Sequence, residues 1–162
     1  MVESIENRAK KSEETHAESM PVAYQQDFYA WVMQNAALLR QKRFSAIDFE
    51  HIAEELEDMG KSEWRALESH LKNVLLHLLK WWSQPTLRGA SWRQSIRNGR
   101  IAIDKILRDS PSLKSRVQDM VSEEYPNARD DAVDETGLHR NSFPEDCPFS
   151  WEQVLDREFW PD

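Results

Sequence analysis

Three histidines and two carboxylates between positions 51 and 77 have the types and spacing that could do chemistry. His51, Glu55 and Asp58 recur at helical spacing in FEHIAEELEDMG, and His70 and His77 follow in KSEWRALESHLKNVLLHLLKWW. Imidazole and carboxylate groups are suitable ligands for zinc, iron or manganese, and helical bundles build such sites from facing helices. The pattern therefore indicates a candidate site for a divalent metal.

The same five side chains also fit a polar border between an apolar helix face and water. His, Glu and Asp are common at such borders, because the polar tip reaches solvent while the stem covers apolar neighbours. The sequence contains neither H-E-x-x-H nor a pair of Glu-x-x-His motifs. We favour the polar border over a bound metal and expect no cofactor. For His77, in the apolar segment HLLKWW, we expect a hydrogen bond to a carboxylate or a backbone carbonyl.

A second group of candidate residues is basic. Six bases and one acid lie between Arg88 and Arg108, whereas seven acids and one base lie between Asp48 and Glu63. Arg93, Arg97 and Arg100 could contact an anion, a nucleic acid or a partner protein. The net charge of −8 disfavours binding to phosphate backbones and to anionic membranes. We therefore expect these arginines to pair with acidic segments of this chain or of a partner.

Composition limits the class of protein. The chain has 162 residues, 40% of them hydrophobic, with seven Trp and four Gly, which is typical of one helical domain with a solid core. The single cysteine, Cys147, excludes an intramolecular disulfide and fits a reducing compartment. Residues 1–20 lack the apolar run of a signal peptide, and no segment approaches the ~20 apolar residues that span a bilayer. We expect a cytoplasmic protein without a membrane partner.

Helices are the elements that must position the candidate residues. Residues 1–22 are polar and predict a flexible tail, followed by a single helical-bundle domain over residues 23–162. One apolar stripe begins after Asp27, whose side chain can cap the first helical turn. A second begins near Ser45 and ends at Gly60, where we expect a left-handed stop. We expect both stripes to face the core. The first comprises Phe28, Trp31, Val32, Asn35, Ala36 and Leu39, and the second Phe49, Ile52, Ala53, Leu56 and Met59.

A long third helix is predicted from Ser62 to Trp82, before Pro85. A turn at Gly60 would make the second and third helices an antiparallel hairpin. In that hairpin the borders that carry the histidines and the carboxylates could meet, as the metal site requires.

Proline, glycine and capping residues divide the rest of the chain into helices. A fourth helix is expected over about 91–108, and a fifth begins with Ser110 as cap and Pro111 at its first position. Pro126 breaks the fifth helix or begins a sixth, which stops at Gly137. A short terminal helix begins at the capping box formed by residues 150 and 153, and the closing FWP docks on the body.

Several short motifs occur in an order that resembles a known family. They are EELEDMGKSE, HLLKW followed by QP, SW at 91–92, SPSL at 110–113, ETGL at 135–138, FPEDCP and FWP. Over about residues 24–161 the chain resembles the domain of unknown function 29 family, which is bacterial and common in cyanobacteria. The resemblance implies a small all-α protein and no particular reaction. The chain departs from the family pattern at Gly99, where a glutamine is expected before Arg100, and this glycine indicates close helix packing.

These observations predict an all-α protein, a single bundle of five to seven helices with the hairpin from Ser45 to Trp82 at its centre. Three functions remain open. The first is a non-enzymatic interaction or regulatory module in the cytoplasm, which binds a protein partner or self-associates. The second is a metal-binding bundle, and the third is nucleic-acid binding through the Arg88–Arg108 helix.

Overall fold

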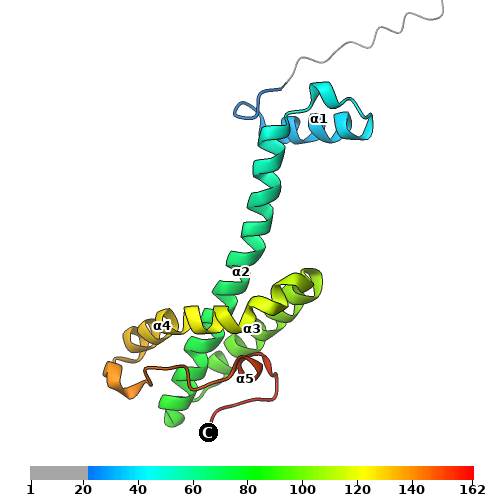
Figure 1. Ribbon diagram of the computed structural model, residues 1–162. Coiled ribbons are helices and arrows are strands. Elements are labelled where there is room, and N and C mark those ends of the chain that lie inside the picture. The colour runs from blue at the N-terminus through cyan, green and yellow to red at the C-terminus, as the bar shows by residue number, and fades with distance from the viewer. Residues whose placement is uncertain (1–21) are drawn as a thin grey trace, which may run out of the picture. The chain divides into compact units, whose positions relative to one another are not determined.

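The computed structural model describes residues 22–162, and within this range the chain is helical and has no strand (Figure 1). The predicted all-α fold is confirmed. No helix in these residues combines the length and the apolar character needed to cross a membrane. The tail predicted for residues 1–22 lies outside the described residues, apart from Val22. The chain separates into two compact units, with the boundary between Glu54 and Glu55. The single domain predicted for residues 23–162 stays a prediction.

The N-terminal unit, described from residue 22 to residue 54, is built around helix α1. This helix covers Phe28–Arg40, and the short 3₁₀ helix η1 follows at Phe44–Ala46, before α2 begins at Phe49. Asp27 caps α1 as predicted, because its side chain accepts a hydrogen bond of 2.9 Å from the backbone N–H of Ala30.

The prediction that both apolar stripes face the core is wrong at several positions. In α1 only Trp31 and Asn35 are buried, whereas Phe28 and Leu39 are 51% and 44% exposed. Phe49, in the second stripe, is 57% exposed. The cause is the small size of the unit: its described elements can cover one side of α1 and not its whole circumference.

The predicted hairpin is wrong, because α2 runs without a break over Phe49–Ser83. Gly60 lies inside this helix, and Gly137 is the one described glycine with a positive φ. A glycine inside a helix costs only about 1 kcal/mol relative to alanine. Good helix formers on both sides, and the ion pairs of Lys61 with Glu57 and Asp58, offset that cost.

The C-terminal unit, residues 55–162, has a closed apolar core. Figure 1 shows α3 (Ala90–Asp109), α4 (Val117–Thr136) and α5 (Trp151–Leu155) gathered around the second half of α2. Leu71 and Val74 of α2 have no exposed surface, and Ile96 of α3 packs in the same core. Gly99 allows α3 to approach, since a Cβ there would lie 2.5 Å from the Val74 Cγ2 atom. The predicted close packing at Gly99 is confirmed.

The helix boundaries of the C-terminal unit are partly as predicted. Gly137 ends α4 at a φ of 68°, and Ser150 and Gln153 form the predicted capping box of α5. Pro126 neither breaks nor begins a helix, because α4 continues through it with Tyr125 and Ala128 buried on either side. A 3₁₀ helix, η3 (Pro111–Arg116), precedes α4, and the predicted side-chain cap at residue 110 is absent.

The closing residues dock on the C-terminal unit as predicted. The ring centroids of Trp160 and Trp81 are 4.8 Å apart, and Pro161 is buried. Arg88 donates a hydrogen bond of 3.4 Å to the carbonyl oxygen of Pro161. The C-terminal segment therefore packs against the core of this unit.

Candidate interaction surfaces

The structure does not assemble the predicted metal ligands into one site. Within the C-terminal unit, Asp58 and His70 are twelve positions apart on an uninterrupted helix, which corresponds to roughly 18 Å at ~1.5 Å per residue. The set depended on the hairpin at Gly60, and the helix does not reverse there. Among residues 22–162, no group of three or more His, Cys, Asp and Glu side chains is placed to hold a metal ion.

His77 makes the hydrogen bond that its sequence context predicts. Its Nδ1 atom lies 2.9 Å from the backbone carbonyl oxygen of Asn73, one turn earlier in α2, so Nδ1–H donates to that carbonyl. Burial lowers the pKa of the imidazole below its usual value of 6.5, which favours the neutral ring.

His51 belongs to a cluster in the N-terminal unit that the sequence analysis missed. Its Nδ1 atom lies 2.7 Å from Asp48 Oδ2, and the indole N–H of Trp31 donates to the same oxygen over 3.1 Å. Burial alone would raise the pKa of the Asp48 carboxyl, but the hydrogen bonds from His51 and Trp31 outweigh it and lower that pKa below 3.8. Asp48 and His51 stand three positions apart in the sequence, and this spacing was the available signal.

Asn35 and Tyr24 complete this cluster. The Asn35 side chain accepts from the backbone N–H of Asp48 and donates to the carbonyl of Trp31, each over 3.0 Å. The Tyr24 ring stacks on the His51 imidazole with their centroids 4.3 Å apart. We call these five residues the Asp48 cluster. Because it bonds α1 to the first residues of α2, the cluster fixes which side of α1 faces outward.

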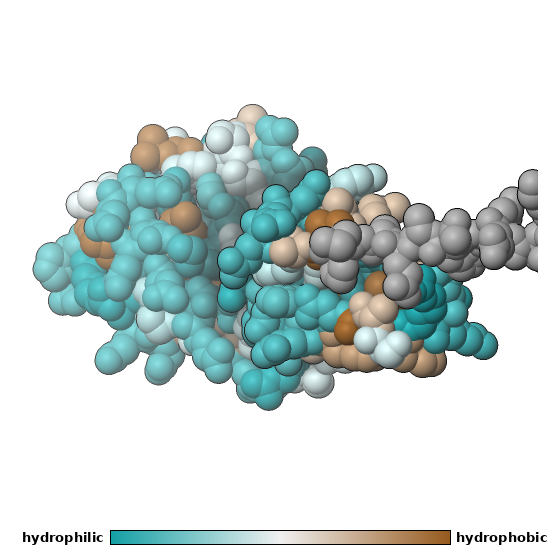
Figure 2. Space-filling view, turned by 90° about the horizontal axis from the view of Figure 1, so that it is seen from above, coloured by the Kyte–Doolittle hydropathy of each residue, from teal (hydrophilic) through white to brown (hydrophobic). Residues whose placement is uncertain are grey.

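The outward side of α1 is apolar. Phe28, Tyr29 and Met33 are at least half exposed, and Val32 and Leu39 are 37% and 44% exposed. The buried side carries Trp31, and the exposed Phe28 ring stacks on it with the two centroids 5.8 Å apart, so the apolar surface of α1 is continuous from its buried side to its exposed side. Figure 2 shows such side chains, in brown and tan, gathered at the surface in the right-hand part of the view. A continuous exposed apolar surface marks interaction sites, so α1 is a candidate interaction surface.

The three arginines predicted to contact an anion, Arg93, Arg97 and Arg100, are not all exposed on α3. Arg100 is 2% exposed, and its guanidinium donates to the carbonyl oxygens of Gln153, Val154 and Phe159 at 2.9–3.1 Å. It also lies over the Trp160 ring, 5.7 Å from its centroid. Burial lowers the pKa of Arg100 to about 10, so the side chain keeps its charge at neutral pH. Arg100 therefore holds the C-terminal segment against α3.

The other two predicted arginines differ from Arg100 in being exposed. Arg93 lies over the Trp81 ring, 5.7 Å from its centroid, and Arg97 has no hydrogen bond or ion pair among residues 22–162. Lys105 and Arg108 of α3 are exposed as well, on a chain whose net charge is −8. Nucleic-acid binding through this helix stays a prediction.

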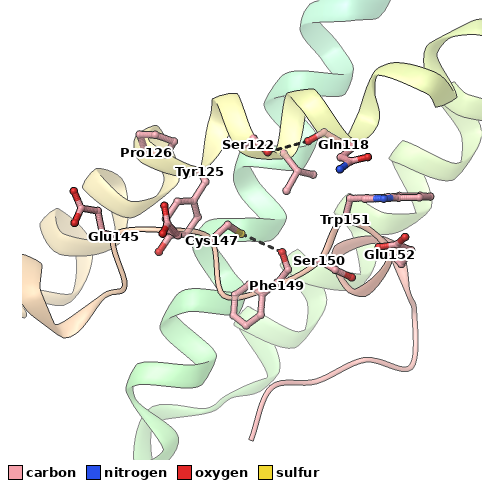
Figure 3. A pocket seen from close by; sticks show the side chains of 12 residues that line it. Gln118, Ser122, Tyr125, Pro126, Glu145, Cys147, Phe149, Ser150, Trp151 and Glu152 are labelled. Atoms are coloured by element: carbon pink, nitrogen blue, oxygen red, sulfur yellow. Dashed lines mark hydrogen bonds between the residues drawn. The ribbon is translucent and has the colours of Figure 1, made fainter.

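An open cleft of about 620 Å³ lies between α4 and the segment that leads into α5 (Figure 3). Figure 3 shows Gln118 and Tyr125 pointing from α4 toward the segment of Cys147 and Trp151. Burial raises the pKa of the Cys147 thiol, and its S–H donates to the carbonyl oxygen of Phe149 over 3.3 Å.

Tyr125, in the same cleft, also remains protonated. Burial raises its pKa to about 12, and its hydroxyl donates to the carbonyl oxygen of Pro144 over 2.7 Å. Tyr125 and Cys147 thus act as hydrogen-bond donors that hold the loop before α5. The cleft presents neither of them as an activated nucleophile.

One family model, described as domain of unknown function DUF29, matches residues 23–160. No curated protein and no solved structure matches the chain. The sequence motifs and the family model therefore agree over nearly the whole of the described chain.

Proposed function

This chain belongs to the DUF29 family, a domain of unknown function, and we propose that it is a non-enzymatic helical interaction module that self-associates through α1. The observation that carries the proposal is the outward side of α1, where five large apolar side chains are between 37% and 74% exposed. Contiguous exposed apolar surface of this kind marks protein contacts.

Charge supports a second copy of the same chain as the occupant of this side of α1. No charged residue occurs between Asp27 and Arg40. Two copies of α1 can therefore pack against each other without like charges facing one another. Permanent contacts between identical subunits are more apolar than transient ones, and two-fold dimers are the commonest oligomers.

The Asp48 cluster supports the proposal because it holds α1 in one orientation. Asn35 is 5% exposed and accepts a hydrogen bond from the backbone N–H of Asp48, which lies outside α1, so rotation of α1 about its axis would break this bond and leave the Asn35 oxygen without its donor. A surface that is already ordered costs less conformational entropy when it binds.

The direct test is the mass of the full chain in solution, measured by light scattering over a range of concentrations. We expect twice the 19.1 kDa of one chain. Val32→Glu together with Leu39→Glu places two charges on the outward side of α1 and should give a monomer. The matched control, Leu87→Glu, alters an apolar residue in η2 that is 59% exposed and should leave the mass unchanged. A monomeric wild type, or equal masses for both variants, would refute self-association through α1.

Photo-crosslinking identifies the occupant in cells. A photoreactive phenylalanine analogue in place of Tyr29, which is 74% exposed, should give an adduct with twice the chain mass. An adduct of another mass would show that a different protein covers α1, which refutes self-association and keeps the interaction function. No adduct at residue 29, with circular dichroism showing a folded protein, would refute both.

The cellular location is part of the same proposal. We place the module in the bacterial cytoplasm, because its one cysteine, Cys147, is a free thiol and fits a reducing compartment. Measurement of the protein in fractionated cells tests this location.

A further inference from the structure

Residues 56–63, in the first part of α2 that belongs to the C-terminal unit, form a second bare surface. Every residue from 56 to 63 is exposed, and Leu56 and Met59 are 62% and 66% exposed. A Cβ added to Gly60 would meet no atom within 4 Å. Large apolar side chains and open space thus occur together on two turns of helix.

This bare surface continues a face that is buried further along the same helix. Leu56 and Leu67 are eleven positions apart, which is close to three helical turns, so they share one side of α2. Leu67 has no exposed surface because the core of the unit covers it. The apolar face of α2 therefore extends beyond the part of the helix that the core of the C-terminal unit covers.

A hollow next to Gly60 adds shape to this surface. It measures about 400 Å³ and is lined by Gly60, Lys61, Trp64, Arg65 and Glu68. The missing side chain at residue 60 leaves space next to the Trp64 indole for one side chain of a facing helix. Such an arrangement of a knob in a hole is how helices pack in coiled coils.

The charges around the bare face identify the kind of helix that fits it. Residues 56–68 contain four acids and two bases. Of the bases, Lys61 is already paired with Asp58 at 3.1 Å and with Glu57 at 3.5 Å, and Arg65 lies at the hollow. Glu63 stands on the bare face itself and has no ion pair within the described part of the chain. The face is therefore apolar with an acidic surplus.

Like charges disfavour a second copy of this stretch as its occupant. Two copies of residues 55–63 packed together would bring acidic side chains of both helices close to one another, in parallel or antiparallel orientation. A helix with Lys and Arg beside its apolar stripe would satisfy the apolar face and the carboxylates together.

We infer that residues 56–63 of α2 are a docking site for a basic amphipathic helix of a partner protein. The inference builds on the proposed interaction function and uses a surface other than the outward side of α1. It assigns the partner by chemistry: apolar residues at helical spacing insert at Leu56, Met59 and the Gly60 hollow, and flanking cations pair with Glu63 and its acidic neighbours.

The test uses full-length protein and a synthetic amphipathic helical peptide with leucine on one side and Lys and Arg on both flanks. Fluorescence anisotropy should show binding of this peptide, and about tenfold weaker binding of a control peptide with Glu at the flanks. The double variant Leu56→Ser and Met59→Ser should weaken binding of the basic peptide about tenfold or more, although its charge is unchanged.

A matched pair of charge variants separates the docking site from general attraction to an acidic protein. Glu63→Lys should weaken binding severalfold, whereas Glu123→Lys, at an exposed position on α4, should change it little. Equal binding of both peptides, or unchanged binding to the Leu56 and Met59 variant, would overturn the inference. Equal effects of the two charge variants would do the same.

The oligomer mass distinguishes this inference from the proposed function. Substitution of Leu56 and Met59 should leave the mass at twice that of one chain, because α1 is intact in that variant. A drop to one chain would show that a second copy occupies residues 56–63, which overturns the basic helix as occupant. Failure of the peptide to bind a dimeric wild type would overturn the docking site and leave self-association through α1 standing.

Discussion

The two units of this protein treat apolar side chains in opposite ways. The C-terminal unit buries Leu71, Val74 and Leu78 completely. The N-terminal unit buries Trp31 but leaves Phe28 and Tyr29 more than half exposed. The longer unit encloses its core with most of α2 and with α3, α4 and α5, whereas the shorter unit has, in its described residues 22–54, α1, the short η1 and the first residues of α2. A similar apolar pattern thus makes a core in one unit and stays exposed in the other.

The buried polar side chains also have different roles in the two units. In the C-terminal unit, Arg100 bonds the closing segment to α3 through three backbone carbonyls. In the N-terminal unit, Asp48, Asn35 and His51 orient one helix whose far side stays bare. Buried polar contacts close the first unit, and they present a surface in the second.

The largest expected contrast is between two leucine truncations. Leu71→Ala removes a fully buried side chain of the C-terminal unit and should lower the free energy of unfolding by about 3 kcal/mol. Leu39→Ala, at a residue 44% exposed in the N-terminal unit, should change it by less than about 0.5 kcal/mol. Urea unfolding at low protein concentration measures both, because dilution removes the contribution of self-association. Equal losses would show that the two units bury apolar residues alike.

Removal of the Arg100 guanidinium should have an effect of similar size. Arg100→Met keeps an unbranched side chain but leaves the carbonyls of Gln153, Val154 and Phe159 without their donor. We expect a loss of about 3 kcal/mol in the free energy of unfolding. Arg97→Met, at an exposed position one turn earlier, is the control and should cost less than about 0.5 kcal/mol. A loss for Arg100→Met as small as the control's would remove its role in closing the unit.

Two glycines of the C-terminal unit should respond to alanine with opposite signs. Gly60→Ala should raise the free energy of unfolding by about 1 kcal/mol, because the helix gains a better former and the new Cβ meets nothing within 4 Å. Gly99→Ala should lower it by about 1 kcal/mol, because the Cβ would lie 2.5 Å from Val74 in a filled core. Thermal unfolding of both variants measures the two shifts. Stabilisation by Gly99→Ala would show that α3 and α2 pack less closely than described.

The smallest effect concerns pH and the Asp48 cluster. The lowered pKa of Asp48 means that the folded carboxyl binds a proton less readily than the unfolded one does. Its stabilising contribution is therefore present above pH 3.8 and is lost as the pH falls through the lower pKa of the folded state. The Trp31 indole N–H resonance should shift in that range, since Trp31 donates to Asp48.

Asp48→Asn is the control for this titration, because asparagine does not ionise. Its Trp31 indole resonance should not titrate with the carboxyl. An indole resonance in the wild type that is constant while the protein stays folded would show that Asp48 does not hold α1.

The sequence predicted the local features of this fold well. Helix caps at Asp27 and Ser150 and the left-handed stop at Gly137 are confirmed, because each depends on residues within one turn. The close approach at Gly99 is confirmed too, and of the two kinds of partner expected for His77, a carboxylate or a backbone carbonyl, the carbonyl is the one observed. The stop at Gly60 was wrong, because the preference of one residue was outweighed by the helix formers around it.

The candidate sites were harder to predict, because they depend on residues distant in sequence. Arg100 looked like a free cation, and its three carbonyl partners lie more than fifty positions away. Trp31 and Asp48 are seventeen positions apart, and no motif joins them. Which side of α1 is buried depends on these contacts.

The sequence by itself determined that this chain is helical, where most of its helices begin and end, and to which family it belongs. Helical periodicity, caps and breakers are local, so they can be read along the chain. Only the tertiary structure decided which apolar stripes are core and which are bare, and whether Arg100 faces solvent or the closing segment. Burial depends on how many elements surround a side chain, and a stripe of leucines has the same sequence pattern whether or not another helix covers it.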